Sequence, residues 1–435
     1  MLEQNPGEMG RIKHQLIEGE ISMKKVLSVV ALASLFGATS VMASGFRIPE
    51  QSVDSTAKAG ANIASAKRAD VAYYNPAGMN LMEDTWHVEV DLTYLHLSEI
   101  DYEAAAPNPI QGNTSSESEH FFLPTLFVVS PDYNGFRFGF STVAPFGLAK
   151  RWRDDLFASF AASKFSLQVI ELNPTVSYAF NDMFSIGGGV RMTYSKATVI
   201  NEAYGTGNPT DFPFTGAPSR YLDGDTVDWG YNLAANFKPN KDWNFAITYR
   251  SNVDLDFEDG DTEINFRPDI TEGDVTVSTP AVLSFSAAYT YDKWTFDLTV
   301  DQTQWSEYEN LDFLYNSADG SSGFPPFDFS EKDWDDVWAI RLGVEYELNP
   351  KVTLMGGIAY DENPVPEEHA NYELPDSDAW LFSAGVRYAY SDNMELGLAV
   401  LYDYKEERTF NNAALDGEFS NASALLVSCA LSYKF

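Results

Sequence analysis

The feature that most constrains this chain is a regular alternation of apolar and polar residues in segments of about ten residues. In residues 86–94, Trp, Val, Val, Leu and Tyr share one face of an extended strand, and His, Glu, Asp and Thr share the other. Similar segments recur at 184–194, 229–237, 243–250, 293–301, 338–346, 380–390, 394–404 and 425–435. One segment would also fit a soluble sandwich, but the repetition predicts many strands that each have one apolar face.

The ends of these segments indicate what the apolar faces contact. Most begin or end with Trp or Tyr on the apolar face, such as Trp243 and Tyr249, which is typical of aromatic girdles at two membrane interfaces. Tight turns alternate with long connections at 251–280, 305–336 and 361–379. Because lipid offers no hydrogen-bond partners, such strands must form a closed sheet. The sequence predicts an all-β fold, a transmembrane antiparallel β-barrel of about fourteen strands in the outer membrane of a Gram-negative bacterium.

The residues before the first strand divide into three parts. A basic start at 23–25, an apolar run at 26–38 and small residues up to Ala43 predict a signal peptide at 23–43, too short to span a membrane. Residues 1–22 have no place in a signal peptide, so we expect an upstream or non-native extension. Residues 44–84 belong to no strand of the barrel at 85–435. On pattern alone they fit the membrane surface, the periplasm or the lumen equally.

Composition argues against several classes of protein. With 28 basic and 64 acidic residues the net charge is −36, so the clustered cations that bind nucleic acid are missing. The single cysteine, Cys429, excludes an internal disulfide. No phosphate-binding glycine loop, hydrolase elbow or zinc-protease motif occurs, so we expect no enzyme, no cofactor and no metal. Two alternatives stay open: a general aqueous porin and, less favoured, an outer-membrane lipase that uses His87.

Residues 71–79 contain the sequence Asn75-Pro76-Ala77-Gly78. Proline fixes its own backbone angle and restricts the preceding residue, so Asn75-Pro76 starts a turn. By its local chemistry this is an ordinary turn, and its meaning depends on the rest of the chain.

Several ordered blocks resemble the FadL/TodX family of outer-membrane transporters of hydrophobic compounds. They are Ser44-Gly45-Phe46, Asn75-Pro76-Ala77, Phe146-Gly147-Leu148-Ala149, Thr248-Tyr249-Arg250-Ser251, Trp305-Ser306, residues 361–366, and residues 375–378 with Trp380 and Ser383. The resemblance covers nearly the whole chain after the signal peptide. It implies that residues 44–84 form a hatch inside the lumen, with Phe46 and Asn75-Pro76-Ala77 as gating residues. It also implies a side opening at a kinked third strand, here 136–146, with the kink at Phe146 and Gly147.

Four arginines occupy inward positions of the predicted strands: Arg191, Arg250, Arg341 and Arg387. We favour pairing with lumen carboxylates and with charged hatch residues, namely Lys58, Asp54, Arg68 and Asp70. The sharper hypothesis is that one of them binds a ligand carboxylate. Where fatty-acid members of the family carry basic residues near the ligand head, this chain aligns Asn201 and Asp335. Burying a twelve-carbon chain is worth about 10 kcal/mol, against about 1.5–3 kcal/mol for a charged hydrogen bond, so the departure affects selectivity more than uptake.

The predicted function is passive uptake of a hydrophobic small molecule, either a long-chain fatty acid or an aromatic hydrocarbon. Apolar residues of the extracellular loops would capture it; the candidates are Phe212, Phe214, Phe324 and Phe327. A shift of the hatch would then connect the ligand to the side opening. The other expected partners are outer-membrane lipid, lipopolysaccharide and the barrel-assembly machinery, which the resemblance suggests reads the last strand and its terminal Phe435.

Overall fold

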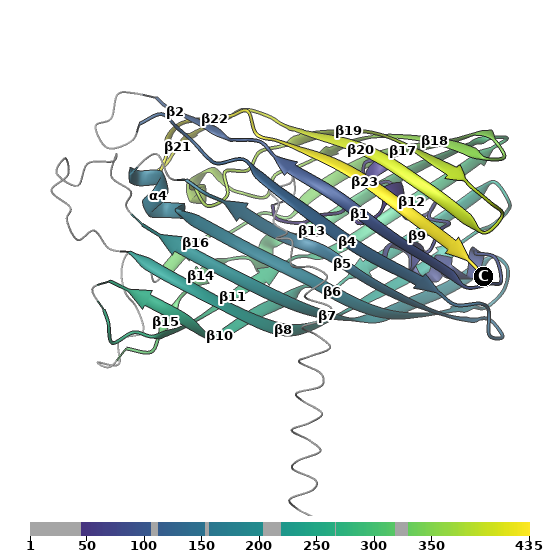
Figure 1. The fold of residues 1–435 in the computed structure, drawn as a ribbon, viewed down its shortest axis with the longest axis horizontal. Helices are drawn as coiled ribbons and strands as arrows, with labels where there is room; N and C mark the ends of the chain where they lie inside the picture. Colours follow the sequence, from purple (N-terminus) through teal and green to yellow (C-terminus); the bar gives the residue numbers. More distant parts are fainter. Residues whose placement is uncertain (1–44, 106–111, 153–155, 203–218, 266, 318–328) are drawn as a thin grey trace, which may run out of the picture.

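The computed structural model describes residues 45–105, 112–152, 156–202, 219–265, 267–317 and 329–435 (Figure 1). The predicted extension at 1–22 and the predicted signal peptide at 23–43 lie outside these residues. Among the described residues, none of the helices has the length and apolar character needed to cross a membrane.

Within the described residues, fourteen antiparallel strands form a closed barrel, which confirms the predicted fold class. They are β1 (His87–Leu97), β4 (Glu119–Val129), β5 (Phe136–Lys150), β6 (Lys164–Ala179), β7 (Phe184–Asn201), β8 (Arg220–Phe237), β9 (Trp243–Arg250), β12 (Ala281–Tyr291), β13 (Trp294–Gln304), β17 (Val337–Asn349), β18 (Val352–Asp361), β19 (Ala379–Ala389), β20 (Met394–Lys405) and β23 (Ser423–Lys434). The first and last strands close the barrel, with His87 opposite Lys434 and Leu97 opposite Ala424.

The alternation in the sequence becomes the two faces of the wall. In β1, Val90 and Leu92 are exposed on the outside, whereas Glu89 and Asp91 are buried in the lumen. Aromatic side chains pair across strands on the outer face, as between Trp294 and Tyr346, whose ring centroids are 4.3 Å apart. The barrel can therefore present an apolar surface to lipid while its lumen stays polar.

One predicted long loop is a hairpin. Residues 251–280 contain β10 (Val253–Ile264) and β11 (Glu272–Thr279), which continue the sheet beyond the barrel wall. The prediction of a long loop there was wrong, because the acidic residues of this segment occupy nearly every second position of a strand. They alternate with inward Val253, Leu255 and Phe257, so the pattern is that of a strand with an acidic outer face.

The other elements outside the wall gather at the same end of the barrel as this hairpin (Figure 1). They are β2 (Asp101–Ala104), β3 (Thr114–Ser115), α4 (Leu156–Ala162), η2 (Trp305–Glu307), β14 (Asn310–Asp312), β15 (Leu314–Tyr315), β16 (Phe329–Glu331), η3 (Glu367–His369), β21 (Arg408–Asn411) and β22 (Asp416–Ser420). We call this the loop end, and the opposite end, where connections are tight, the turn end.

The chain before β1 folds back into the lumen, which resolves its placement. It contains α2 (Val53–Ala57), α3 (Val71–Tyr74) and η1 (Pro76–Leu81). We call residues 45–84 the hatch. Lumen side chains of the wall accept hydrogen bonds from its backbone, including Asp91 from Val53 N at 2.8 Å and Asp297 from Ser65 N at 3.0 Å. Such bonds satisfy the backbone groups that short helices leave unpaired.

Glycines of the wall let the hatch backbone approach closely. A Cβ atom at Gly357 of β18 would lie 2.2 Å from the carbonyl carbon of Lys58, and one at Gly187 of β7 would lie 2.6 Å from Ala77 N. Any larger residue at these two positions would have to displace the hatch.

We predict that Gly357→Val leaves a folded, heat-modifiable barrel but unseats the hatch and raises single-channel conductance in planar bilayers. Gly356→Val is the matched control, because a Cβ at this neighbouring position would lie 3.6 Å from Ser383 O, which is ordinary contact. Equal conductance of the two variants would contradict the prediction.

Candidate functional site

Three of the predicted inward arginines and one hatch arginine build an ionic network around the hatch. Arg387 donates to Asp54 of the hatch at 2.7 Å and to Glu89 at 2.9 Å. Arg341 donates to Asp361 at 2.6 Å and to the hatch carbonyl of Ala59 at 3.3 Å. Arg68 of the hatch forms an ion pair with Glu395 of β20 at 2.7 Å. Arg191 forms an ion pair with Glu171 of β6, also at 2.7 Å. All four arginines are buried.

The fourth predicted arginine, Arg250, differs from these three. Its guanidinium pairs with Glu171 and lies 4.2 Å over the ring of Tyr73 in the hatch. About 14% of its side chain is exposed, whereas Arg341 and Arg387 are 0% exposed. Removing one partner of a buried pair costs about 3–5 kcal/mol, so the three enclosed arginines hold the structure together. Arg250 is the most exposed of the four predicted arginines.

Two hatch residues expected in this network bond within the hatch instead. Lys58 donates to Asn62 and to Ser65, both at 2.7 Å. Asp70 accepts from Ser52 and Asn62, also at 2.7 Å. They stabilise the shape of the hatch rather than its attachment.

The Asn75-Pro76-Ala77 sequence joins the hatch to the wall. Asn75 caps η1 by accepting from Gly78 N at 3.2 Å, and it donates to Asn236 of β8 at 2.9 Å. Pro76 occupies the first position of η1, where its missing N–H costs nothing. The carbonyl of Ala77 accepts from Ser185 of β7 at 2.8 Å. The motif therefore anchors the hatch to β7 and β8.

The third barrel strand, β5, leaves its neighbour before either strand ends. Among the described residues, β4 pairs with β5 only from Leu126 to Val129, although β4 begins at Glu119. The register of β5 on β6 shifts between Val143 and Phe146. Pro124 of β4 and Pro145 of β5, which carry no amide hydrogen, lie beyond the last pair. We call the unpaired stretch between residues 119–125 and 143–150 the side gap.

Hatch residues occupy the pairing positions that β4 leaves open. Gly147 N donates to Phe46 O at 2.9 Å, and Ile48 N donates to Pro145 O at 2.8 Å. Gly147 is itself in register with Gln168 of β6, so the irregularity precedes it. The hatch thus forms an antiparallel β-bridge to β5 at the side gap, between Arg47 and Phe146.

Gln51 completes this closure, and nothing in the sequence singled it out. Its side-chain amide donates to Ala144 O at 2.9 Å and accepts from Ala144 N at 2.8 Å, so it imitates a strand partner. Its carbonyl accepts from Thr125 of β4 at 2.9 Å. One residue therefore contacts both edges of the side gap.

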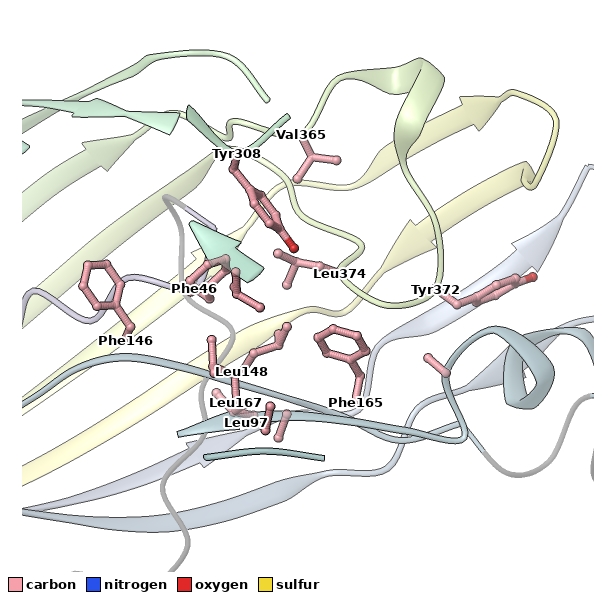
Figure 2. Packing of buried hydrophobic residues seen from close by; sticks show 14 of the residues in the cluster. Phe46, Leu97, Phe146, Leu148, Phe165, Leu167, Tyr308, Val365, Tyr372 and Leu374 are labelled. Atoms are coloured by element: carbon pink, nitrogen blue, oxygen red, sulfur yellow. The ribbon is translucent and has the colours of Figure 1, made fainter. Parts of the chain in front are cut away.

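An apolar cluster lies between the hatch and the loop end, and it extends from Phe146 past Phe46 and Phe165 to Tyr372 (Figure 2). The ring of Phe46 lies 4.6 Å from Trp305 and 6.1 Å from Phe146. Gly45, with a φ of 70°, fits between Trp305 and Trp334, where a Cβ would lie within 2.8 Å of either ring. The start of the hatch is therefore held in an apolar environment, next to the side gap.

The two positions at which we expect a departure from fatty-acid members, Asn201 and Asp335, have different surroundings. Asn201 accepts from Arg220 of β8 at 3.0 Å, because these residues are paired in register. Sequence reasoning missed Arg220, whose proximity depends on that register. Asp335 lies in a loop and donates its N–H to Pro364 O at 3.0 Å. The predicted capture residues Phe212, Phe214, Phe324 and Phe327 lie outside the described residues.

His87, the residue of the lipase alternative, lies near the turn end, and its Nε2 is 3.1 Å from Glu83 O. In the described part of the chain, no group of three or more His, Cys, Asp or Glu side chains could hold a metal ion.

A fourteen-strand barrel with a hatch in its lumen defines an outer-membrane channel. The chain belongs to the family described as outer membrane protein transport protein (OMPP1/FadL/TodX), which matches residues 34–435. This confirms the family that the sequence blocks indicated, whose members are channels for hydrophobic substrates.

Relatives and solved structures agree with this assignment. The chain is 27% identical to a long-chain fatty acid transport protein of Escherichia coli O6:H1 (strain CFT073), over 72% of this chain and 77% of the relative. It is 26% identical to outer membrane protein P1 of Haemophilus influenzae, over 94% and 99%. A FadL homologue of Pseudomonas aeruginosa shares the fold with a TM-score of 0.77 at 19% identity, over 90% and 100%. The toluene transporter TbuX of Ralstonia pickettii also shares the fold, with a TM-score of 0.65 at 18% identity, over 88% of this chain and 98% of the transporter.

We predict that Asn75→Ala and Pro76→Ala leave a folded, heat-modifiable barrel but reduce uptake of hydrophobic compounds, because the hatch loses its anchor on β7 and β8. Loss of the cap alone should cost the hatch about 1 kcal/mol. Asn240→Ala is the control, since Asn240 caps Trp243 N in a tight turn outside the hatch. Normal uptake by both hatch variants would identify the motif as an ordinary turn.

We also predict that closure of the hatch depends on pH through Asp70. Burial, followed by the charges of Glu89 and Asp54, raises the pKa of Asp70 to about 7, and the nearby Arg387 opposes this only in part. In a displaced, hydrated hatch the pKa would return to the ordinary value of 3.8. The closed state thus binds a proton that the open state releases, so closure weakens as pH rises from about 4 to about 7.

The measurement is the opening frequency in planar bilayers at about pH 5 and about pH 8. Openings should be more frequent at the higher pH, and Asp70→Asn should remove that part of the difference. An unchanged pH dependence in Asp70→Asn would contradict the assignment to this residue.

Proposed function

We propose that the protein mediates passive uptake of hydrophobic small molecules, long-chain fatty acids or aromatic hydrocarbons, with exit through the side gap into the membrane. The observation that carries the proposal is the interruption of the wall between β4 and β5, which is closed from inside by the hatch. A barrel in lipid must pair its backbone groups, so an interrupted pair of strands served by a removable segment is suited to be a gate.

The route follows the apolar side chains. Ligand captured at the loop end, with Phe212, Phe214, Phe324 and Phe327 as candidates, passes to the apolar cluster around Phe46. A shift of the hatch then withdraws residues 46–51 from the side gap. Transfer of an apolar molecule from water to lipid is downhill, so the process requires no energy source.

Relatives support both classes of ligand. One is a long-chain fatty acid transport protein and a protein of similar fold is a toluene transporter. We propose the following division of the chain: an extension at 1–22, a signal peptide at 23–43, a hatch at 44–84 and a barrel at 85–435. The further partners that we propose are outer-membrane lipid, lipopolysaccharide and the barrel-assembly machinery.

Uptake by cells that lack their own transporter tests the function. Expression of this chain should increase uptake of labelled long-chain fatty acid or labelled toluene, and an increase in neither would refute the proposal. The porin alternative predicts steady ion conductance in planar bilayers. The lipase alternative predicts release of fatty acid from phospholipid that is lost in His87→Ala.

We predict that cross-linking the side gap blocks uptake. In a Cys429→Ser background, Thr125→Cys and Ala144→Cys place thiols on the two edges that Gln51 joins, and a short bifunctional thiol reagent should join them and abolish uptake. The control pair is Leu126→Cys with Thr142→Cys, which are opposite each other in the last paired register. Cross-linking there should leave uptake unchanged. Full uptake after complete cross-linking at 125 and 144 would exclude exit through the side gap.

A further inference from the structure

A small cavity lies between the hatch and the wall, directly inside the side gap. Its volume is about 40 Å³, and its lining includes Arg47 and Tyr73 of the hatch with Phe146, Arg191, Arg250 and Asp301 of the wall. By this measure one water needs about 10–15 Å³, so the space is large enough for water or for a group the size of a carboxylate.

The charged groups that line this cavity are mainly cationic. They are the guanidinium groups of Arg47, Arg191 and Arg250 and the carboxylate of Asp301. Glu171, beside the cavity, pairs with both Arg191 and Arg250. Asp301 pairs with Arg47 and with Arg341, and Arg341 also has Asp361 at 2.6 Å and Glu50 of the hatch at 3.8 Å. An anion that enters the cavity therefore meets more cationic than anionic side chains in its lining.

Two of the three arginines have some donors that are only loosely engaged, although Arg250 also forms a close ion pair with Glu171. Arg47 reaches Asp301 at 3.4 Å and Thr303 at 3.2 Å, and Arg250 reaches the carbonyl of Tyr73 at 3.4 Å. Charge-assisted bonds of this kind are usually about 2.7–2.9 Å long. Each of these two side chains is about 14% exposed, unlike Arg191 at 1%. One comes from the hatch and the other from the wall.

The position of the cavity fits the route of an anionic ligand. The backbone of Arg47 pairs with that of Phe146, at the end of the apolar cluster and at the edge of the side gap. Transfer of a carboxylate out of water without a partner costs several kcal/mol of desolvation free energy. A fatty acid therefore needs a cationic group at this point of its route, and a hydrocarbon does not.

We propose that Arg47 and Arg250 form a carboxylate site that holds the head group of a long-chain fatty acid at the side gap. This rests on the proposed uptake function and assigns its substrate class. A ligand carboxylate here competes with Asp301 for Arg47. Binding therefore weakens the ion pair that ties residues 46–48 to the wall, and it couples arrival of the ligand to withdrawal of the hatch.

The first test is equilibrium binding of a labelled long-chain fatty acid and of its methyl ester to the purified full chain. The unaltered protein should prefer the acid. Arg47→Gln and Arg250→Gln should each lower affinity for the acid about ten-fold, which corresponds to ~1.4 kcal/mol, and leave the ester within about two-fold. Arg250→Lys should recover part of the loss.

Arg68→Gln is the matched control, because it removes a hatch-to-wall arginine that does not line this cavity. It should change binding of acid and ester together. An equal loss of acid and ester in Arg47→Gln would show that Arg47 only holds the hatch, and no loss in either variant would show that water alone occupies the cavity. Both outcomes overturn the site.

Uptake separates this proposal from the proposed function. With an active unaltered chain, Arg47→Gln should lower fatty-acid uptake about ten-fold relative to toluene uptake. If the unaltered chain imports neither compound, the proposed function fails, and the binding ratio still decides the carboxylate site. If it imports fatty acid and both variants do so equally well, only the site fails.

Discussion

The need to pair every backbone hydrogen-bonding group in lipid governs the whole structure. It forces the strands into a closed barrel, with β1 joined to β23. It also makes the interruption between β4 and β5 informative, because residues 46–48 and Gln51 of the hatch form hydrogen bonds to its edges. In the proposed function, the position of the hatch therefore controls access from the lumen to the membrane.

The lumen keeps the hatch in place with charges as well as with buried apolar contacts to the wall. Asp54 lies between Arg387 and Arg68, and Arg341 holds the carbonyl of Ala59. Such buried pairs add little net stability, but removing one partner is costly, so they define one seated position. Short contacts at Gly357 and Gly187 set the same position sterically. A hatch held by geometry and exchangeable charges is compatible with release on binding of a charged ligand.

The chain also shows how a channel for apolar molecules could treat acids and hydrocarbons differently. The cluster around Phe46 serves both, since burial of apolar surface requires no specific partner. Arg47 and Arg250 matter only for an anion. The resemblance to fatty-acid transporters predicts a departure at Asn201 and Asp335. Here Arg220 adjoins Asn201, and the cavity arginines lie deeper, at the side gap.

By itself the sequence determined the barrel, its approximate strand number, its outer and inner faces and its family, because alternation and aromatic ends are local properties of each strand. The sequence analysis predicted a long connection at 251–280 where the structure has a hairpin, because the many acidic residues there made the alternating pattern hard to recognise. Only the tertiary structure decided what depends on register and on contacts between distant segments. Gln51 meets Ala144 and Arg47 meets Asp301 because the hatch folds back against particular strands. The side gap likewise exists only through the pairing that β5 makes with β6 and omits with β4.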